Sequence, residues 1–472
     1  MEAKKFDLVV IGSGPAGEKG AAQVAYFGKT VALVEKEDVL GGAAANTGTL
    51  PSKTLRESAL YISGFRQRGL FGVNFELKDK VTARDFLYRE RLVVESEHAR
   101  IAENIERHDV ALYRGRAAFV DEHTISVTPE NGKPSQIRGD VILIASGSDP
   151  FRPPNFPLDD PRVYDSDTIL NIHDIPDSIL IAGGGVIGCE YACMFAALGI
   201  DVHLVEGRDR LLGFMDAELI DTLTRCMSTM GITFHMPDSI DTVDAGEKIQ
   251  IRMKSGETIE VETMLAATGR TGNTQDMNLE AVGLEAGPRG HLDVDEHYQT
   301  SVPHVYAAGD VIGFPALAST AMEQARIAMV HAFDLAYKTE LATILPYGIY
   351  TIPECSMAGE SEASLTEAGI PYVVGRARYD ANARGQIIGD EQGFIKLLFH
   401  EEDMRLLGVH VIGEQASELV HVGLTALLLN AGADLFINTC YNYPTLTEIY
   451  KYATYDALGA RARLMAAREA AG

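Results

Sequence analysis

The feature that most constrains this 472-residue chain is a pattern that it contains twice. A short apolar run leads into a glycine-rich turn, a helical stretch follows, and a second apolar run ends in an acidic residue. In the first copy the apolar run 7–11 precedes Gly12, Gly14 and Gly17, and the acid is Glu35. Such glycines allow a tight turn and a close approach of the backbone to a pyrophosphate, while the acid accepts ribose hydroxyls. This copy predicts a dinucleotide-binding α/β unit.

The second copy has the same order of elements. Residues 178–182 form the expected strand, Gly183, Gly185 and Gly188 form the turn, and Glu206 is the acid after the next strand. Two copies of the pattern indicate two dinucleotide sites in one chain. The economical assignment is one flavin site and one nicotinamide site.

Bulk composition narrows the possible partners and the compartment. The length suggests about three domains at ~150 residues each. A formal net charge of −26 argues against nucleic acid and against anionic membrane surfaces. No apolar run reaches the ~18 residues of a membrane span, and the N-terminus does not read as a signal peptide. The five scattered cysteines indicate a reducing cytoplasm. Cys189 and Cys193 are expected to be buried packing residues, with a redox or metal role as the alternative.

Three later segments mark the rest of the organisation. Apolar runs at 141–147 and 264–270 each end in a small-residue turn, the second containing Gly269, and the segment 300–310 ends at Asp310. The proline-rich stretch 146–162 is typical of a linker. From about Ile344, alternating and helical patterns suggest an antiparallel sheet with helices.

The segment 41–53 carries a family resemblance. It reads GGAAANTGTLPSK and resembles the flavoprotein disulfide reductases, which typically read G-G-x-C-x-N-x-G-C-x-P-S-K at this place. Ala44 and Thr49 stand at the two cysteine positions. Near the C-terminus, Tyr443 stands where that family carries its histidine base, and the glutamate that normally orients the base is retained as Glu448. A thiol mechanism needs a thiolate and a proton acceptor, so the chain is not expected to reduce disulfides.

The resemblance implies an α/β fold with two Rossmann-like dinucleotide-binding domains, for FAD and NAD(P), and a C-terminal α+β dimerisation domain. The implied boundaries are 1–150 for the first FAD part, 151–272 for the NAD(P) domain, 273–344 for the second FAD part and 345–472 for dimerisation. Several stretches, including 164–170, 269–274 and 442–445, are similar to the soluble pyridine nucleotide transhydrogenase branch. Ala44 departs from that branch, which often keeps a lone cysteine there.

The same resemblance assigns roles to individual residues. Lys53 and Glu190 are expected to form an ion pair at the junction of flavin and nicotinamide. Thr49 is expected to lie near the flavin, and Tyr443 to reach the partner subunit's flavin edge. Asp310 is expected to contact the ribityl–phosphate part of FAD. Structural alternatives are a solvated Lys53, a first-turn acid for Glu190, an interface tyrosine for Tyr443 and a helix N-cap for Asp310.

Cofactor breadth depends on three charged residues after the second strand of the second pattern. The Glu206 carboxylate favours the NAD ribose and repels a 2′-phosphate, by about 4 kcal/mol at ~4 Å and an effective dielectric of ~20. Arg208 and Arg210 are able to offset that repulsion with charge-assisted hydrogen bonds. A structural role is the alternative for Arg210, and the sequence leaves the preference between NAD and NADP open.

The expected activity is an FAD-dependent transhydrogenase that passes hydride between NADPH and NAD⁺ in ping-pong fashion, as a cytoplasmic homodimer without a metal. One alternative is an NAD(P)H diaphorase or quinone reductase, which shares every motif. Another is a flavin-bound protein without catalytic activity. The arginine- and alanine-rich tail 461–472 is expected to form a helix.

Overall fold

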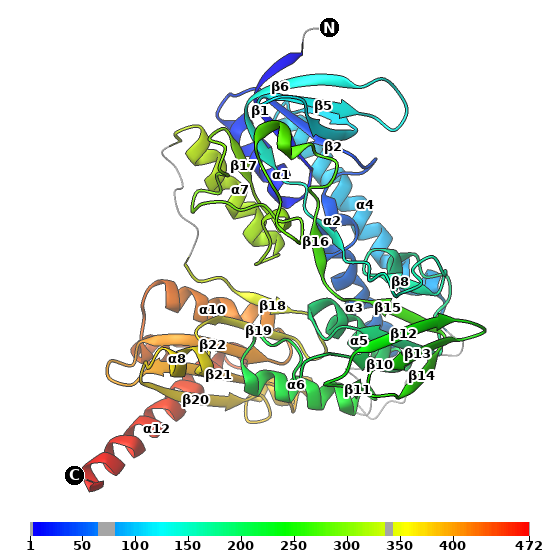
Figure 1. Ribbon diagram of the computed structural model, residues 1–472. Coiled ribbons are helices and arrows are strands. Elements are labelled where there is room, and N and C mark those ends of the chain that lie inside the picture. Colours follow the sequence, from blue (N-terminus) through cyan, green and yellow to red (C-terminus); the bar gives the residue numbers. More distant parts are fainter. Residues whose placement is uncertain (1–2, 65–80, 336–342, 472) are drawn as a thin grey trace.

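The computed structural model of the protein describes residues 3–64, 81–335 and 343–471. Its architecture consists of a seven-stranded, mainly parallel sheet with antiparallel pairing at one edge, a five-stranded parallel sheet, and a separate antiparallel sheet at the C-terminal end (Figure 1). Helices flank the two large parallel arrays. The α/β class and the two-dinucleotide-domain fold predicted from the sequence are therefore confirmed. The domain boundaries stay predictions, and residues 65–80, 336–342 and 472 of the predicted domains lie outside the described residues.

The first sheet has seven strands in the order β3-β2-β1-β6-β5-β4, with β17 added beside β6. Its central strand β1 pairs in parallel with β2 on one side and β6 on the other, so the strand ends meet at one edge. Helices α1 and α7 pack together against this sheet. The strands are β1 Lys4–Ile11, β2 Val31–Glu35, β3 Ala111–Arg114, β4 Arg116–Phe119, β5 Thr124–Thr128, β6 Ser135–Ile144 and β17 Val305–Ala307. The helices around it are α1 Pro15–Tyr26, α2 Gly42–Asn46, α3 Thr49–Ser63, α4 Ala83–Arg107, η3 Leu279–Val282, η4 Asp310–Ile312 and α7 Ala318–Ala332.

The second parallel sheet has the order β11-β10-β9-β15-β8 and lies below the first in Figure 1. Strand β9 covers the residues expected from the sequence, and the helix that follows its glycine turn is buried along almost its whole length. The elements are β8 Val163–Asp165, η2 Thr168–Asn171, β9 Ser178–Ala182, α5 Val186–Ala197, β10 Asp201–Val205, α6 Ala217–Thr229, β11 Thr233–His235 and β15 Thr263–Ala266. An adjoining three-stranded sheet consists of β12 Ile240–Ala245, β13 Ile249–Met253 and β14 Thr258–Val261.

The chain passes between the two parallel sheets on a short antiparallel pair of strands. These are β7 Ser148–Pro150 and β16 Arg270–Gly272, in register Arg270 to Pro150. The stretch 146–162, predicted as a linker, therefore includes one strand of the crossing. Pairing the outgoing strand with the returning one ties the two dinucleotide units together at the point where the chain changes domain.

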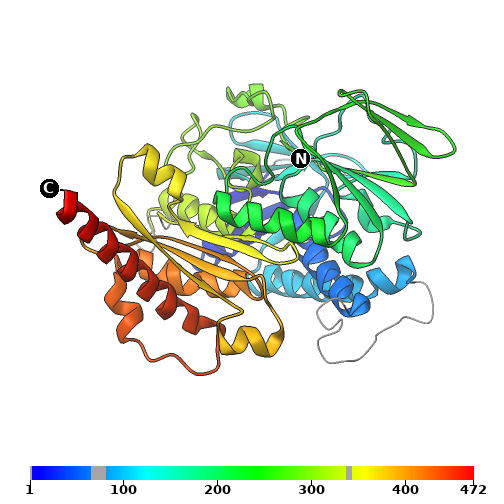
Figure 2. The ribbon, with the colours of Figure 1, turned by 90° about the horizontal axis from the view of Figure 1, so that it is seen from below.

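The C-terminal part is an antiparallel sheet in the order β18-β19-β22-β21-β20. Figures 1 and 2 place α6 between this sheet and the second parallel sheet. Residues 350–354, expected in the antiparallel sheet region, form the connection between β18 and β19. The tail is helical, as predicted, because α12 runs to Ala471. The elements are β18 Tyr347–Ile349, β19 Cys355–Gly359, α8 Glu362–Glu367, β20 Tyr372–Arg378, α9 Ala383–Ile388, β21 Phe394–His400, β22 Leu406–Ile412, α10 Ala416–Leu428, α11 Ala433–Asn438, η5 Leu446–Glu448 and α12 Ile449–Ala471.

Candidate active site

The two dinucleotide units meet at an ion pair between Lys53 and Glu190. Lys53 lies on α3 beside the first sheet, and Glu190 lies on α5 of the second unit, 2.7 Å from Nζ to Oε2. The Glu190 side chain is 4% exposed and that of Lys53 is 27% exposed. Neither structural alternative holds, because Lys53 is paired and Glu190 lies beyond the first turn of α5. The structure therefore brings together two residues predicted to act as a pair, and their catalytic role stays a prediction.

The connection between β18 and β19 completes this cluster. The Tyr350 backbone N–H donates to Oε1 of Glu190 at 2.9 Å, and the Lys53 ammonium lies 5.1 Å from the centre of the Tyr350 ring. One turn further along α3, buried Arg56 donates to the Thr351 carbonyl at 3.1 Å and pairs with Glu354 at 3.1 Å. Sequence reasoning gave the segment 348–354 no place at the site. Backbone contacts of this kind leave no signal in residue types.

The first glycine turn has the geometry of a phosphate cradle. Gly12 has φ +100°, and a Cβ there would lie 2.3 Å from the Ala145 carbonyl oxygen. A Cβ on Gly17 would lie 1.8 Å from the Gly12 oxygen, whereas at Gly14 the nearest atom would be 3.8 Å away. Gly14 directly precedes the first residue of α1, at a helix N-terminus where backbone N–H groups favour an anion. This arrangement fits the pyrophosphate of FAD.

The acid of the first unit is held by neutral donors. The backbone N–H and the hydroxyl of Ser13 donate to Oε2 of Glu35 at 2.9 and 2.6 Å, and the Glu37 N–H donates to Oε1 at 2.9 Å. No arginine contacts this carboxylate among the described residues. Its negative charge is therefore not paired with an arginine of the described chain, and the predicted contact of Glu35 with ribose hydroxyls stays a prediction.

The second glycine turn has the same backbone conformation and the same close contacts as the first. Gly183 has φ +116°, and a Cβ there would lie 2.3 Å from the Ala267 oxygen. A Cβ on Gly188 would lie 1.8 Å from the Gly183 oxygen, and a Cβ on Gly185 would meet nothing within 4 Å. The predicted second dinucleotide cradle is therefore present in the backbone, and nucleotide binding by these glycines stays a prediction.

The acid of the second unit has an arginine as its partner. Oε2 of Glu206 accepts from the Gly184 N–H at 2.8 Å, and Oε1 accepts from the Arg208 N–H at 2.9 Å. The Arg208 guanidinium adds bonds from Nε at 2.9 Å and from Nη2 at 3.1 Å. Burial disfavours the charged carboxylate, but the bonds from Arg208 and Gly184 outweigh it and lower the pKa of Glu206.

Asp310 ends a polar chain that crosses between the domains. The Ser148 hydroxyl donates to Oδ2 of Asp310 at 2.9 Å, and Arg270 Nε donates to the same hydroxyl at 2.8 Å. The other end of Arg270 lies 3.5 Å from Asp167. Asp310 is the first residue of η4 and does not cap it, so the expected N-cap role is wrong; Gly309 occupies that position. Gly269, predicted at the crossing, lies directly before Arg270 and accepts from the Phe151 N–H at 2.9 Å. Sequence reasoning missed Ser148, whose partner is far away in the chain.

Comparison with known proteins identifies the family. The sequence model of the pyridine nucleotide-disulphide oxidoreductases matches residues 6–325, and that of their dimerisation domain matches residues 345–454. The chain belongs to the pyridine nucleotide-disulphide oxidoreductase family. The flavoprotein resemblance predicted from the sequence is therefore confirmed.

Several relatives of this chain share the name soluble pyridine nucleotide transhydrogenase. The chain is 44% identical to a soluble pyridine nucleotide transhydrogenase of Mycobacterium tuberculosis, over 96% of this chain and 97% of the relative. A protein of the same name from Pseudomonas putida is 41% identical over 97% and 99%. Among solved structures, LpdA from Mycobacterium tuberculosis has 26% identity and a TM-score of 0.88 over 96% and 99%. A flavoprotein disulfide reductase, RclA from Escherichia coli, shares the fold with 24% identity and a TM-score of 0.86, over 95% and 99%.

The positions that carry the family's dithiol hold no sulfur in this chain. Ala44 lies on α2. Thr49 is the first residue of the next helix, α3, one turn before Lys53. Cys189 and Cys193 do not replace them, because both are fully buried on α5 and burial raises the pKa of both thiols. A thiol with a raised pKa is mostly protonated at neutral pH and a poor nucleophile.

Tyr443, at the position of the family's histidine base, stands apart from this cluster within one chain. It lies between α11 and η5 with its side chain 73% exposed. Among the contacts of the described residues, none joins Tyr443 to Lys53 or Glu190. Glu448, at the end of η5, accepts a long contact of 3.5 Å from the Tyr452 hydroxyl. The predicted role of Tyr443 at a flavin therefore depends on a second copy of the chain.

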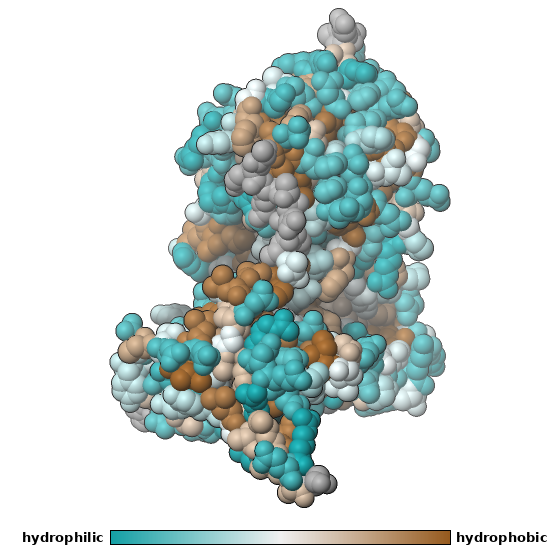
Figure 3. Space-filling view, turned by 90° about the vertical axis from the view of Figure 1, so that its left-hand side faces the viewer, coloured by the Kyte–Doolittle hydropathy of each residue, from teal (hydrophilic) through white to brown (hydrophobic). Residues whose placement is uncertain are grey.

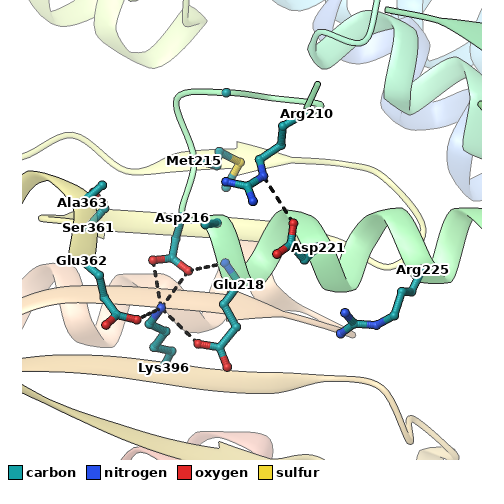
Figure 4. Close-up of a pocket in the computed structure, with 12 residues that line it drawn as sticks. Arg210, Met215, Asp216, Glu218, Asp221, Arg225, Ser361, Glu362, Ala363 and Lys396 are labelled. Atoms are coloured by element: carbon teal, nitrogen blue, oxygen red, sulfur yellow. Dashed lines mark hydrogen bonds and ion pairs between the residues drawn. The ribbon is translucent and has the colours of Figure 1, made fainter. Parts of the chain in front are cut away.

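A pocket of about 430 Å³ lies between α6 and the C-terminal sheet (Figure 4). At its floor is the ammonium of Lys396, which is 1% exposed and contacts three carboxylates, Asp216 at 2.9 Å, Glu218 at 3.1 Å and Glu362 at 2.5 Å. Burial opposes the charge, but bonds to Glu362 and Asp216 outweigh it and raise the pKa of Lys396. This network joins the second dinucleotide unit to the dimerisation domain. Sequence reasoning missed it because Lys396 sits inside an apolar strand.

Proposed function

We propose that this protein is an FAD-dependent soluble pyridine nucleotide transhydrogenase, moving hydride between NADPH/NADP⁺ and NAD⁺/NADH. The observation that carries the proposal is the Lys53–Glu190 pair, 2.7 Å across the junction of two dinucleotide cradles, in a chain with Ala44, Thr49 and Tyr443 where disulfide reductases have their dithiol and base. The names of relatives that are 40–44% identical over nearly the whole chain support it.

The residues that would hold FAD are Gly12, Gly14 and Gly17 at the pyrophosphate, Glu35 at the adenosine ribose and Asp310 at the ribityl–phosphate part. Bound FAD supplies a two-electron centre that takes and returns a hydride. The Lys53 ammonium provides a fixed positive charge at the junction, and Glu190 holds it there. Because Tyr350 N–H fixes the other oxygen of Glu190, the pair does not have to reorganise as charge develops.

The absent thiols determine where the reducing equivalents leave. Gly183, Gly185, Gly188 and Glu206 would bind nicotinamide nucleotides, and the chain has one such cradle beside Lys53. Without a thiolate at positions 44 and 49 or a base at 443, the hydride has no disulfide acceptor. In the proposed function, a second nicotinamide nucleotide collects it at the same cradle. The two nucleotides therefore take turns, which predicts ping-pong kinetics.

We further propose a homodimer built through residues 345–454, where the dimerisation domain matches. Large apolar side chains are exposed in this part of the chain, among them Leu428, Leu429 and Tyr443. Figure 3 shows apolar side chains gathered across the middle of one face of the molecule. Exposed apolar surface of this kind is typical of a protein interface. Tyr443 would then reach the partner subunit.

A cytoplasmic location, without nucleic acid or membrane as partner, fits the charge of −26. Among the described residues, no helix combines the length and the apolar composition needed to cross a membrane.

The experiment is an anaerobic titration of the purified flavoprotein with NADPH, followed by excess NAD⁺, monitored by flavin absorbance. We expect bleaching, then recovery, with one NADH formed per flavin. Bleaching without recovery would favour a diaphorase that hands electrons to a quinone, a dye or oxygen. No bleaching by NADPH or NADH would contradict both enzymatic functions.

A further inference from the structure

The acid of the second dinucleotide unit is held from two sides by different kinds of donor. Each oxygen of Glu206 accepts one backbone N–H, from Gly184 at 2.8 Å and from Arg208 at 2.9 Å. The Arg208 guanidinium adds a second layer of bonds at 2.9 and 3.1 Å. The backbone layer is fixed by the glycine turn and the strand end. The guanidinium layer belongs to a side chain that is 61% exposed and therefore has room to turn.

The neighbouring arginine points elsewhere. Arg210 Nε lies 3.3 Å from Asp221 on α6, and Figure 4 shows the two side chains facing each other in the pocket above Lys396. The Arg210 guanidinium is therefore paired with the Asp221 carboxylate in that pocket. Of the two arginines in this loop, Arg208 alone contacts Glu206 in the described part of the chain.

We propose that Arg208 is a movable counter-charge that lets one cradle accept nicotinamide nucleotides both with and without a 2′-phosphate. The proposal rests on the proposed function, since a transhydrogenase has to accept both at this cradle. For NADP(H) the guanidinium turns from Glu206 to the 2′-phosphate and remains close enough to offset the carboxylate. For NAD(H) the ribose hydroxyls take the place of its Nε and Nη2 bonds on Glu206.

The geometry makes both states acceptable for Glu206. When the guanidinium leaves, the carboxylate keeps the N–H groups of Gly184 and Arg208, so neither oxygen is stranded. A buried carboxylate with no remaining donors would resist the exchange. An arginine presents several donors in one plane, which suits a phosphate as well as a carboxylate. The cradle therefore exchanges one hydrogen-bonding partner of Arg208 for another.

The test uses the FAD-loaded enzyme and two adenosine ligands that differ by one phosphate, ADP and 2′,5′-ADP, with dissociation constants from calorimetry. In Arg208→Ala we expect 2′,5′-ADP to bind about 10- to 100-fold more weakly. ADP should change by less than about fivefold, because the backbone donors to Glu206 remain. Arg210→Ala is the matched control, which removes an equal charge two residues away and should leave both constants within about fivefold.

A second variant tests the counter-charge directly. Glu206→Gln removes the repulsion, so 2′,5′-ADP should bind as tightly as in the parent or more tightly, while ADP weakens. When Glu206→Gln and Arg208→Ala are combined, the affinity for 2′,5′-ADP should fall less than in Arg208→Ala alone. The reason is that the Glu206 carboxylate, whose repulsion Arg208 offsets, is no longer present. Flavin content and the melting temperature show that each variant is folded.

Three results would overturn the proposal: equal weakening of ADP and 2′,5′-ADP in Arg208→Ala, no change of either, or a loss in Arg210→Ala as large as in Arg208→Ala. These constants do not depend on hydride transfer. If the parent enzyme binds both ligands but fails the NADPH–NAD⁺ titration, the proposed function fails while the role of Arg208 stands.

Discussion

The two dinucleotide units share one backbone design and differ in the charge beside the acid. Gly17 and Gly188 would each place a Cβ 1.8 Å from the carbonyl oxygen of the first glycine of its turn. Two residues after each acid, a backbone N–H donates to its Oε1 at 2.9 Å, from Glu37 in one unit and Arg208 in the other. The side chains at these positions carry opposite charges.

This difference separates two tasks. The first unit suits a cofactor that stays, because Glu35 is satisfied by Ser13 and by backbone and presents a fixed negative charge to a ribose. The second unit suits ligands that come and go, because an exposed arginine can be exchanged for ligand groups at Glu206. On the proposal made above, the backbone of each turn positions a dinucleotide, and the side chain two residues after the acid selects which dinucleotide is accepted.

The largest effects should come from filling the turns. In Gly17→Ala the added methyl group meets the Gly12 oxygen, and FAD affinity should fall by more than about 100-fold. In Gly188→Ala the same clash falls on the nicotinamide unit, so ADP affinity should drop similarly while FAD is retained. Flavin content and ADP calorimetry on both variants check this. Loss of both ligands in either variant would show that the units do not act separately.

Next in size is a charge reversal that gives the second unit the pattern of the first. Arg208→Glu places a carboxylate where Glu37 stands in the first unit. The ratio of NADPH to NADH affinity should fall by about 100-fold, through the lost bonds and the added repulsion. Flavin reduction by each nucleotide over a concentration series gives the two constants. An unchanged ratio would mean that selectivity lies outside this position.

The pair that joins the two units should have a smaller effect on binding than on rate. Glu190→Gln removes the counter-charge of Lys53 but keeps a partner for the Tyr350 N–H. The rate of flavin reduction should fall by roughly 30-fold, as for losing about 2 kcal/mol from a charge pair. Stopped-flow reduction at saturating NADPH measures it. Glu106→Gln, at an exposed acid on α4, is the control. A fall in nucleotide affinity with an unchanged limiting rate would contradict a role at the junction.

The sequence was sufficient where one residue type serves one local geometry. The glycine turns and the strand at 178–182 were predictable, since a Cβ on the first or the third glycine of either turn would clash with a backbone carbonyl oxygen. The Lys53–Glu190 contact was predicted through the family resemblance. Long-range polar partners were not predictable: Ser148 and Arg270 are far apart in the chain and meet only because β7 pairs with β16.

Two charged residues have partners that the sequence does not show. Lys396 lies in an apolar strand and is buried, and three carboxylates from two other elements surround its ammonium. Asp310 reads as a helix cap, but its carboxylate is turned to the Ser148 hydroxyl. In both cases the charge is explained by elements that pack against it, and a one-dimensional pattern does not contain that packing.

The smallest effect is expected for the reverse exchange, Glu37→Arg, which gives the first unit the charge pattern of the second. The Glu37 side chain is solvent-exposed. Glu37 contacts Glu35 through its backbone N–H, and the substitution retains that hydrogen bond. Oε2 of Glu35 also keeps both Ser13 bonds. FAD has no 2′-phosphate, so the new arginine can only compete with ribose hydroxyls for Oε1. FAD affinity in reconstitution of the apoprotein should weaken by less than about fivefold.

Removing the Ser13 hydroxyl sharpens this last test. Ser13→Gly gives the turn the residue that the second unit has at Gly184 and removes the 2.6 Å bond to Glu35. In the double variant with Glu37→Arg, the introduced guanidinium meets a carboxylate with one donor fewer, as Arg208 does at Glu206. The fold decrease in FAD affinity in the double variant should then exceed the product of the fold decreases in Ser13→Gly and Glu37→Arg. If the two effects on FAD affinity simply multiply, the Ser13 hydroxyl and the charge at position 37 act independently. Further positions would then be needed to give Glu35 the arginine-paired state of Glu206.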